Sequence, residues 1–234
     1  MKKHTMLKHE RMITISETQD KVFTNNDFQN VMLGRQSIRN FDKSVKIPHD
    51  EMVKMIEEAT TAPSACNLQA WRFVVVDTPE GKEKLSTYFM KFNTPQVQTA
   101  SAMVLLFGDT QAFKSYRALW NKAYENKQIT KEKLEEVFNT FLPLYEHASR
   151  DMLVADSTVD TALVAMQFML AARGHGYETN PIAGYDPKKA ATTWGLDPER
   201  YVPVMAIAVG KPAPDDEGEV RSVRYPVEQV YEFH

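Results

Sequence analysis

The chain contains 234 residues, of which 43% are apolar and 25% are charged, and its formal net charge is −3 at pH 7. A chain of this size can bury a substantial core within one domain, which argues against general disorder. Because acidic and basic residues are interspersed, no uniform positive field would recruit a polyanion, and nucleic acid is not an expected partner. The single cysteine, Cys66, excludes an internal disulfide and a zinc site made of several thiolates.

The first 26 residues are rich in charged and polar side chains. They lack the continuous apolar segment of a secretory signal and show no sustained helical period. We therefore expect an N-terminal arm over residues 1–26, one domain over residues 27–234 and, from the single cysteine, a cytoplasmic location. No later stretch reaches the roughly 18 successive apolar residues that a membrane span requires.

Helix caps and apolar runs divide the first half of the chain. A first helix is expected over residues 26–34 with Asn26 as its cap, and a second over residues 48–61 with acidic residues in its first turn. Thr78 and Pro79 are a typical cap and first-turn pair, so a third helix follows them. The β-branched or apolar runs that predict strands here are Phe73–Val76 and Met103–Phe107.

The second half favours helices before a further strand. Two amphipathic helical stretches are expected in an excursion over residues 110–150, and a buried helix over residues 156–173 ends at Gly174 or Gly176. A short helix over residues 188–194, which Asp186 and Pro187 would cap, and a strand over residues 204–209 follow. Strands separated by helices predict a sheet covered by helices. Three prolines make the C-terminal extension, residues 211–234, an extended segment that can reach across a partner.

Several common catalytic motifs are missing from the sequence. Gly174 and Gly176 begin a dinucleotide fingerprint, but Thr179 stands in place of its third glycine, so the pair is better explained as a helix end. No phosphate-binding P-loop and no nucleophile elbow are present. His147 and Asp151 are spaced to share one helical face, where a surface pair is favoured over two metal ligands because no third ligand follows.

Three separated segments carry residues suited to ligand binding. In residues 34–41, the guanidinium groups of Arg35 and Arg39 and the hydroxyl of Ser37 could hold a phosphate, although a solvated basic turn is the alternative. Residues 62–73 join a helix to a strand through small and amide side chains, which allow the backbone to approach a flat ligand closely. Residues 180–186 are again small and turn-forming. Taken singly, the last two could be ordinary loops.

Together, in this order and at these separations, the three segments resemble the nitroreductase family of FMN enzymes, and within it the small bacterial NAD(P)H-dependent proteins. The resemblance extends from Asp27 to Val230. It implies an α+β fold with a central mixed β-sheet covered by helices. It also implies a homodimer that has FMN sites at its interface and a C-terminal segment exchanged or extended over the partner.

The resemblance also implies a role for individual residues. Arg35 and Ser37 match positions at the phosphate and ribityl end of FMN, and Arg39 matches a position at the N1–O2 edge of the ring. Asn93 and Gln96 match contacts to the pyrimidine edge, where Gln96 replaces a common lysine. The loop that the other subunit contributes is matched by Pro63, Ser64, Ala65 and Asn67, and the reactive face of the flavin by Pro181, Ile182, Ala183 and Gly184. The C-terminal cations at the phosphate are Arg224 and Arg221. No metal site is implied.

The implied activity is hydride transfer from NADH or NADPH through flavin N5 to a nitroaromatic or quinone-type acceptor, with ping-pong kinetics and no catalytic side chain beyond the flavin. Aromatic residues of the 110–150 excursion could line the acceptor pocket, although core packing is the more frequent role of such residues. They are Phe113, Tyr116, Trp120, Tyr124 and Phe138. Two alternatives stay open: a dehalogenating or flavin-fragmenting enzyme on the same scaffold, and a flavin-binding protein without turnover.

Overall fold

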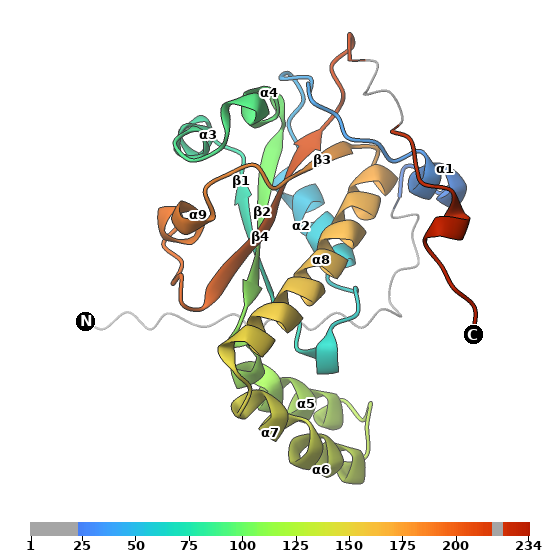
Figure 1. Cartoon of the computed structure of the whole chain (residues 1–234), viewed down its shortest axis with the longest axis vertical. Helices are drawn as coiled ribbons and strands as arrows, with labels where there is room; N and C mark the ends of the chain where they lie inside the picture. Colours follow the sequence, from blue (N-terminus) through green and yellow to red (C-terminus); the bar gives the residue numbers. More distant parts are fainter. Residues whose placement is uncertain (1–22, 217–221) are drawn as a thin grey trace.

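A computed structural model describes residues 23–216 and 222–234, and its centre is a four-stranded sheet in the order β1-β2-β4-β3 (Figure 1). The strands are β1 (Trp71–Val76), β2 (Ala102–Asp109), β3 (Glu178–Ile182) and β4 (Tyr201–Gly210). All three strand pairs are antiparallel. The expected α+β class is confirmed, but a mixed sheet was the wrong expectation for the strands of this chain. Val76 lies opposite Met103, because the helices between β1 and β2 return the chain to the end of the sheet where it left.

Both faces of the sheet are covered, which explains why β2 is apolar along its whole length. Met103, Leu105 and Phe107 point to one face, against α3 (Pro79–Ser86), α4 (Thr94–Thr99) and α9 (Pro187–Thr193). The alternate residues of β2 point to the other face, against α2 (His49–Ala59) and α8 (Arg150–Gly174). Figure 1 shows the two groups of helices on opposite sides of the strands.

Local capping rules account for most helix starts. Thr78 caps α3 by accepting the N–H of Gly81 at 3.1 Å, and Asp186 caps α9 by accepting the N–H of Lys188 at 3.0 Å. The first helix, α1 (Phe28–Leu33), is capped by Asp27 and not by Asn26, so that expectation was wrong by one residue. An ionisable carboxylate serves this position well, since it accepts the N–H of Asn30.

The longest helix is α8, which begins earlier than the sequence pattern predicted because Ser149 caps it. By length and composition alone, α8 is the one described helix that could cross a membrane. Val164, Ala165 and Phe168 are fully buried against the sheet, so one face of α8 belongs to the protein core.

The excursion after β2 contains three helices where two were expected. They are α5 (Tyr116–Glu125), α6 (Lys131–Thr140) and α7 (Leu142–Glu146), preceded by the 3₁₀ turn η4 (Ala112–Ser115). Pro143 in the first turn of α7 separates it from α6. His147 follows α7, whereas Asp151 lies in the first turn of α8, so the two do not share a helical face as predicted.

The sequence pattern missed one strand. Asn180, Pro181 and Ile182 were expected in a turn but form the second half of β3. A proline is tolerated there because β3 is the edge strand of the sheet, with β4 on one side and only an isolated bridge, from Ser37 to Thr179, on the other. The C-terminal residues 222–234 contain only the 3₁₀ turn η5 (Val227–Gln229) and are exposed.

Candidate functional site

Residues 35–39 run alongside the start of β3. A parallel bridge joins Ser37 to Thr179, and the N–H of Ile38 donates to the carbonyl oxygen of Thr179 at 3.2 Å. The side-chain amide of the buried Asn180 donates in return to the carbonyl oxygen of Ile38 at 2.9 Å. The first and third ligand-binding segments of the sequence are therefore neighbours.

A third stretch of chain, around the 3₁₀ turn η3 (Lys91–Asn93), completes this group. Arg39, which is half-buried, donates from Nη2 to the carbonyl oxygen of Phe92 at 2.5 Å. Gln96 follows in α4 with 1% of its surface exposed, and its Oε1 is buried without a hydrogen-bond partner among the described residues. Arg39, Asn93 and Gln96 thus come from one connected region.

Gly184 is tied to the same stretch of chain. Its carbonyl oxygen accepts hydrogen bonds from the N–H of Met90 at 2.9 Å and from Nδ2 of Asn93 at 2.8 Å. A Cβ atom at this position would lie 2.5 Å from that Nδ2 and 2.9 Å from Cζ of Phe92. Only glycine allows so close an approach. The neighbouring Ala183 is exposed, so this turn presents backbone to the surface.

Arg35 carries a buried donor without a visible acceptor. Its Nη1 has no hydrogen-bond partner among the described residues, and neither has Oε2 of Glu178. Burial raises the pKa of Glu178, while the cations Arg173 and Arg35 oppose the rise. Arg173 forms the ion pair with Glu178. Nη1 of Arg35 is therefore still able to donate a hydrogen bond to a ligand. A buried, unpaired guanidinium N–H is costly, and an anion would satisfy it.

The second predicted segment lies elsewhere. Residues 63–70 precede β1 at the end of the sheet where Trp71 lies opposite Gly108, and the N–H of Asp109 donates to Ala70. The bridge at Ser37 lies at the other end, because Thr179 pairs with Val209 and Val209 with Ala102. The length of β2, about 20 Å, separates the two ends. Within one chain, Pro63, Ser64, Ala65 and Asn67 are therefore anchored far from Ser37.

The loop at this end has an unusual backbone. Around the 3₁₀ turn η2 (Ala65–Asn67), three residues other than glycine have left-handed φ angles. They are Cys66 at 49°, Asn67 at 57° and Gln69 at 51°. Each such residue costs about 1–2 kcal/mol, so contacts outside the loop must maintain this conformation.

The C-terminal cation is also apart from the others. Arg224 is exposed, and within the described part of the chain its hydrogen bonds reach only Ser222 and Val223. Arg221 lies outside the described residues. The exposed segment that carries Arg224 is rich in large apolar side chains, which are Val223, Tyr225, Val227, Val230, Tyr231 and Phe233.

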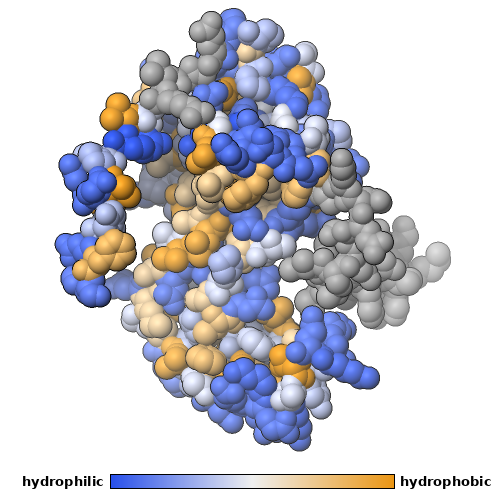
Figure 2. All heavy atoms as spheres, turned by 90° about the vertical axis from the view of Figure 1, so that its right-hand side faces the viewer, coloured by the Kyte–Doolittle hydropathy of each residue, from blue (hydrophilic) through white to orange (hydrophobic). Residues whose placement is uncertain are grey.

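An apolar stripe is exposed on α8 as well. Val159, Leu163 and Met166 are spaced for one helical face, with 59%, 43% and 40% of their surfaces exposed. In α1, Phe28 and Met32 are exposed, and Val31 is the buried residue. Figure 2 shows apolar atoms gathered toward the middle of one face of the molecule, between hydrophilic areas. Apolar surface on this scale is typical of a protein interface.

Comparison with known proteins assigns the chain to a family. A model of the nitroreductase family matches residues 32–211, which include the three segments described above. The chain belongs to the nitroreductase family. It is therefore an oxidoreductase, as the sequence resemblance indicated.

Two relatives within the family are similar to this nitroreductase over most of its length. The CLA biosynthesis enone reductase of Lactiplantibacillus plantarum is 53% identical over 213 residues, which are 91% of this chain and 97% of the relative. The Bacillus subtilis (strain 168) protein YdgI, provisionally named an NAD(P)H nitroreductase, is 45% identical over 208 residues, or 89% of this chain and 98% of that protein.

Solved structures agree with the fold. The crystal structure of CLA-ER, an enone reductase of gut-bacterial fatty acid saturation metabolism, matches with a TM-score of 0.82 and 54% identity, covering 89% of this chain and 98% of that chain. A structure from Exiguobacterium sibiricum in complex with FMN matches with a TM-score of 0.85 and 39% identity, covering 90% of this chain and 99% of that chain.

The aromatic residues of the excursion divide into two groups in this nitroreductase. Tyr116 is buried in a small core with Val137 and Leu142, so core packing is its role. Burial raises the pKa of Tyr116 to about 12. Tyr124 is 42% exposed, while Trp120 and Phe138 pack against the small core only in part. The assignment of these aromatics to an acceptor pocket stays a prediction.

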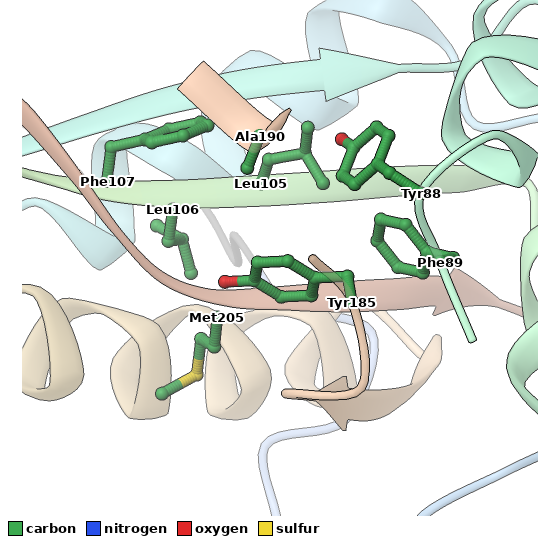
Figure 3. Close-up of a pocket in the computed structure, with 8 residues that line it drawn as sticks. All are labelled: Tyr88, Phe89, Leu105, Leu106, Phe107, Tyr185, Ala190 and Met205. Carbon is green, nitrogen blue, oxygen red and sulfur yellow. The ribbon is translucent and has the colours of Figure 1, made fainter. Parts of the chain in front are cut away.

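A small apolar cavity lies beside Tyr185, the residue after Gly184 (Figure 3). Tyr88, Phe89 and Met205 are among the residues that line it, and the ring of Tyr185 stacks on that of Phe89 at 5.3 Å. The space between these side chains does not hold even a water molecule. It is therefore a packing gap behind the site and is too small for a flavin.

Sequence reasoning overlooked Asp160 and Phe92. Asp160 is 2% exposed in α8 and accepts the N–H of Ala65 at 2.9 Å. A charged residue in an otherwise apolar helical stretch was the signal that could have revealed it. Phe92 offers no such signal, because its role depends on a backbone oxygen and on a contact with Gly184.

Proposed function

We propose that this nitroreductase binds FMN and transfers hydride from NADH or NADPH to an electron-poor acceptor. The observation that carries the proposal is that hydrogen bonds join residues 35–39, 90–96 and 179–184. Beside them, Nη1 of Arg35 is buried without a hydrogen-bond partner among the described residues. The relative from Exiguobacterium sibiricum that was solved in complex with FMN supports the choice of cofactor.

The residues present fit this cofactor. Arg35 and Ser37 would hold its phosphate and ribityl end, and the orphaned donor of Arg35 is suited to an anion. Arg39 would stand at the N1–O2 edge, while Asn93 and Gln96 would contact the pyrimidine edge through amide groups, of which Gln96 has an unsatisfied oxygen. Arg224 and Arg221, from the C-terminal segment, would add positive charge at the phosphate.

Bound FMN would supply hydride transfer at N5, from the nicotinamide to an acceptor that occupies the same place afterwards. The stretch Pro181, Ile182, Ala183 and Gly184 would lie along its reactive face. The hydrogen bonds from Asn93 and Met90 hold Gly184 in place, so that backbone and not a side chain would border the reacting atoms. A charge at Arg39 would stabilise the negative charge of the reduced ring.

We further propose that the active unit is a homodimer. Pro63, Ser64, Ala65 and Asn67 are anchored at the far end of β2 from Ser37, so a second copy is needed to bring this loop to the same flavin. The exposed apolar stripe of α8 and the apolar C-terminal segment offer surface for such a partner. The C-terminal segment would then extend over the other subunit.

Two classes of acceptor follow from different observations. Nitroaromatics and quinones are acceptors typical of the family as a whole. YdgI is named as an NAD(P)H nitroreductase, which agrees with a nitroaromatic acceptor. An enone is the second candidate, because the relative that is 53% identical is an enone reductase. In that case a hydride and a proton would add across the carbon–carbon double bond. Both classes are conjugated and accept a hydride at an electron-poor atom.

One experiment tests the cofactor and the activity together. Protein reconstituted with FMN should be yellow, bleach anaerobically with NADH or NADPH, and regain its colour when an enone, quinone or nitroaromatic is added. Mass measurement of the released cofactor distinguishes FMN from FAD, and kcat/KM for the three acceptors ranks their classes. Failure to bind FMN, or a spectrum that NAD(P)H does not bleach, would overturn the proposal.

A further inference from the structure

Asp160 is a buried carboxylate that the proposed hydride transfer does not use. It lies in the middle of α8, 2% exposed, and its Oδ1 accepts the N–H of Ala65 at 2.9 Å. Its Oδ2 is buried without a hydrogen-bond partner among the described residues. Burying a charged group is costly, so a specific benefit must offset this cost.

The next residue of α8 holds the other end of the same loop. Thr161 donates from Oγ1 to the carbonyl oxygen of Ala70 at 3.3 Å, and the N–H of Asp109 donates to that oxygen at 3.0 Å. Across the neck of the loop, Oγ of Ser64 accepts the N–H of Gln69 at 3.0 Å. Successive residues of one rigid helix therefore hold both ends of residues 65–70.

Between these two ends lie the left-handed residues Cys66, Asn67 and Gln69. Strained backbone of this kind persists only where surrounding contacts determine it, and it is concentrated at functional sites. Asn67 is exposed at the tip, where its Oδ1 accepts a hydrogen bond from Nε2 of Gln69 at 3.3 Å. The strain thus presents an oriented amide on the outside of the molecule.

We propose that Asp160 is a positioning residue that holds residues 64–69 in the conformation in which Asn67 meets the flavin of a second copy of the chain. The inference rests on the proposed function, because the flavin and the second copy belong to it. Asp160 acts through the N–H of Ala65 and does not touch the cofactor itself.

Two variants separate this role from a general contribution to folding. Asp160→Asn keeps an oxygen that can accept the N–H of Ala65, whereas Asp160→Ala removes it without obstructing the helix. Hydrogen exchange of the flavin-free protein measures the loop directly, with amides of β2 as an internal control for the intact sheet. Fluorescence titration with FMN measures the dissociation constant of the same samples.

We expect Asp160→Asn to leave loop exchange and the FMN dissociation constant within threefold of wild type. Asp160→Ala should speed exchange in residues 65–70 at least tenfold and weaken FMN binding at least tenfold, with β2 still protected. If β2 loses protection in that variant, Asp160→Ser takes its place, since the hydroxyl is too short to reach Ala65.

Three outcomes overturn the proposal: unchanged loop exchange in Asp160→Ala, a loosened loop with unchanged FMN affinity, or equal damage by Asp160→Asn. A wild-type protein that binds no FMN would instead overturn the proposed function. In that event, loop exchange still reports whether Asp160 holds the loop.

Discussion

The side-chain amide of Asn93 donates a 2.8 Å hydrogen bond to the carbonyl oxygen of Gly184, although 91 residues separate them in the chain. The same oxygen accepts the N–H of Met90. The turn after β3 is thus held from outside, by a segment that precedes α4. This relationship places the backbone of Gly184 and the pyrimidine-edge candidates Asn93 and Gln96 in one rigid unit.

Gly184→Ala should disturb this unit. The added Cβ would lie 2.5 Å from Nδ2 of Asn93, so either the amide or the turn must move. We expect a loss of about 1–3 kcal/mol in the free energy of unfolding, and reduction of bound flavin by NAD(P)H about tenfold slower, or about 1.4 kcal/mol in the barrier. Thermal denaturation and stopped-flow absorbance measure the two effects. Ser86→Ala, at an exposed position of α3, is the control, and equal behaviour of both variants would contradict the prediction.

Arg35→Ala should weaken the retention of FMN. The variant removes the guanidinium whose buried Nη1 is unpaired, and a charge-assisted contact of this kind contributes about 1.5–3 kcal/mol. The FMN dissociation constant should therefore rise about 10- to 150-fold in a fluorescence titration. Arg117→Ala removes the same charge from the exposed surface of α5 and should leave the constant unchanged. Unaltered affinity in Arg35→Ala would exclude Arg35 from the phosphate site.

Arg39→Gln should change the reduction potential of the flavin more than it changes FMN affinity. Glutamine can still donate to the carbonyl oxygen of Phe92, but the positive charge is lost, and the neutral Gln96 supplies none in its place. The two-electron potential should become more negative, with each 30 mV corresponding to about 1.4 kcal/mol. Reduction by NAD(P)H should then slow, while reoxidation by a quinone should not. Spectroelectrochemical titration of wild type and variant at equal flavin content measures the two-electron potential. An unchanged potential would assign Arg39 to phosphate binding or to structure.

Leu163→Glu should prevent dimer formation. Leu163 lies in the exposed apolar stripe of α8, and a buried, unpaired carboxylate is incompatible with an interface core. Light scattering after gel filtration should show a monomer with little bound FMN. Leu144→Glu is the matched control, because Leu144 is 56% exposed on α7, outside the proposed interface. A dimer that persists in Leu163→Glu would remove this face of α8 from the interface.

Asp160→Asn should make stability less dependent on pH. Burial raises the pKa of Asp160 above its ordinary value of 3.8, against the influence of the hydrogen bond from the N–H of Ala65. With a raised pKa in the folded state, the contribution to stability is present at low pH and is lost as the pH rises through the raised pKa. The neutral variant avoids this loss, so it should gain on wild type in the range above pH 3.8, the ordinary pKa of the carboxyl group.

Urea denaturation of the flavin-free proteins measures the difference in the free energy of unfolding at each pH. Asp151→Asn removes the same charge from the exposed first turn of α8 and serves as the comparison. A difference between Asp160→Asn and wild type that stays constant across this range would show that Asp160 is not desolvated as described.

The sequence alone predicted the local features of this protein. The apolar run of β2 and the caps Thr78 and Asp186 act within a few residues, and the structure confirms them. The order of the three ligand-binding segments identified the family. Such signals depend on periodicity and on hydrogen bonds between near neighbours, which a single sequence displays.

The tertiary structure decided which of these segments meet. It joined Ser37 to Thr179 and Asn93 to Gly184, and it left residues 63–70 at the opposite end of β2. It also made Pro181 part of an edge strand and buried Asp160 beneath a strained loop. No local pattern specifies these relationships, because they depend on how the two helical layers pack against the sheet and on which backbone groups that packing leaves to be paired.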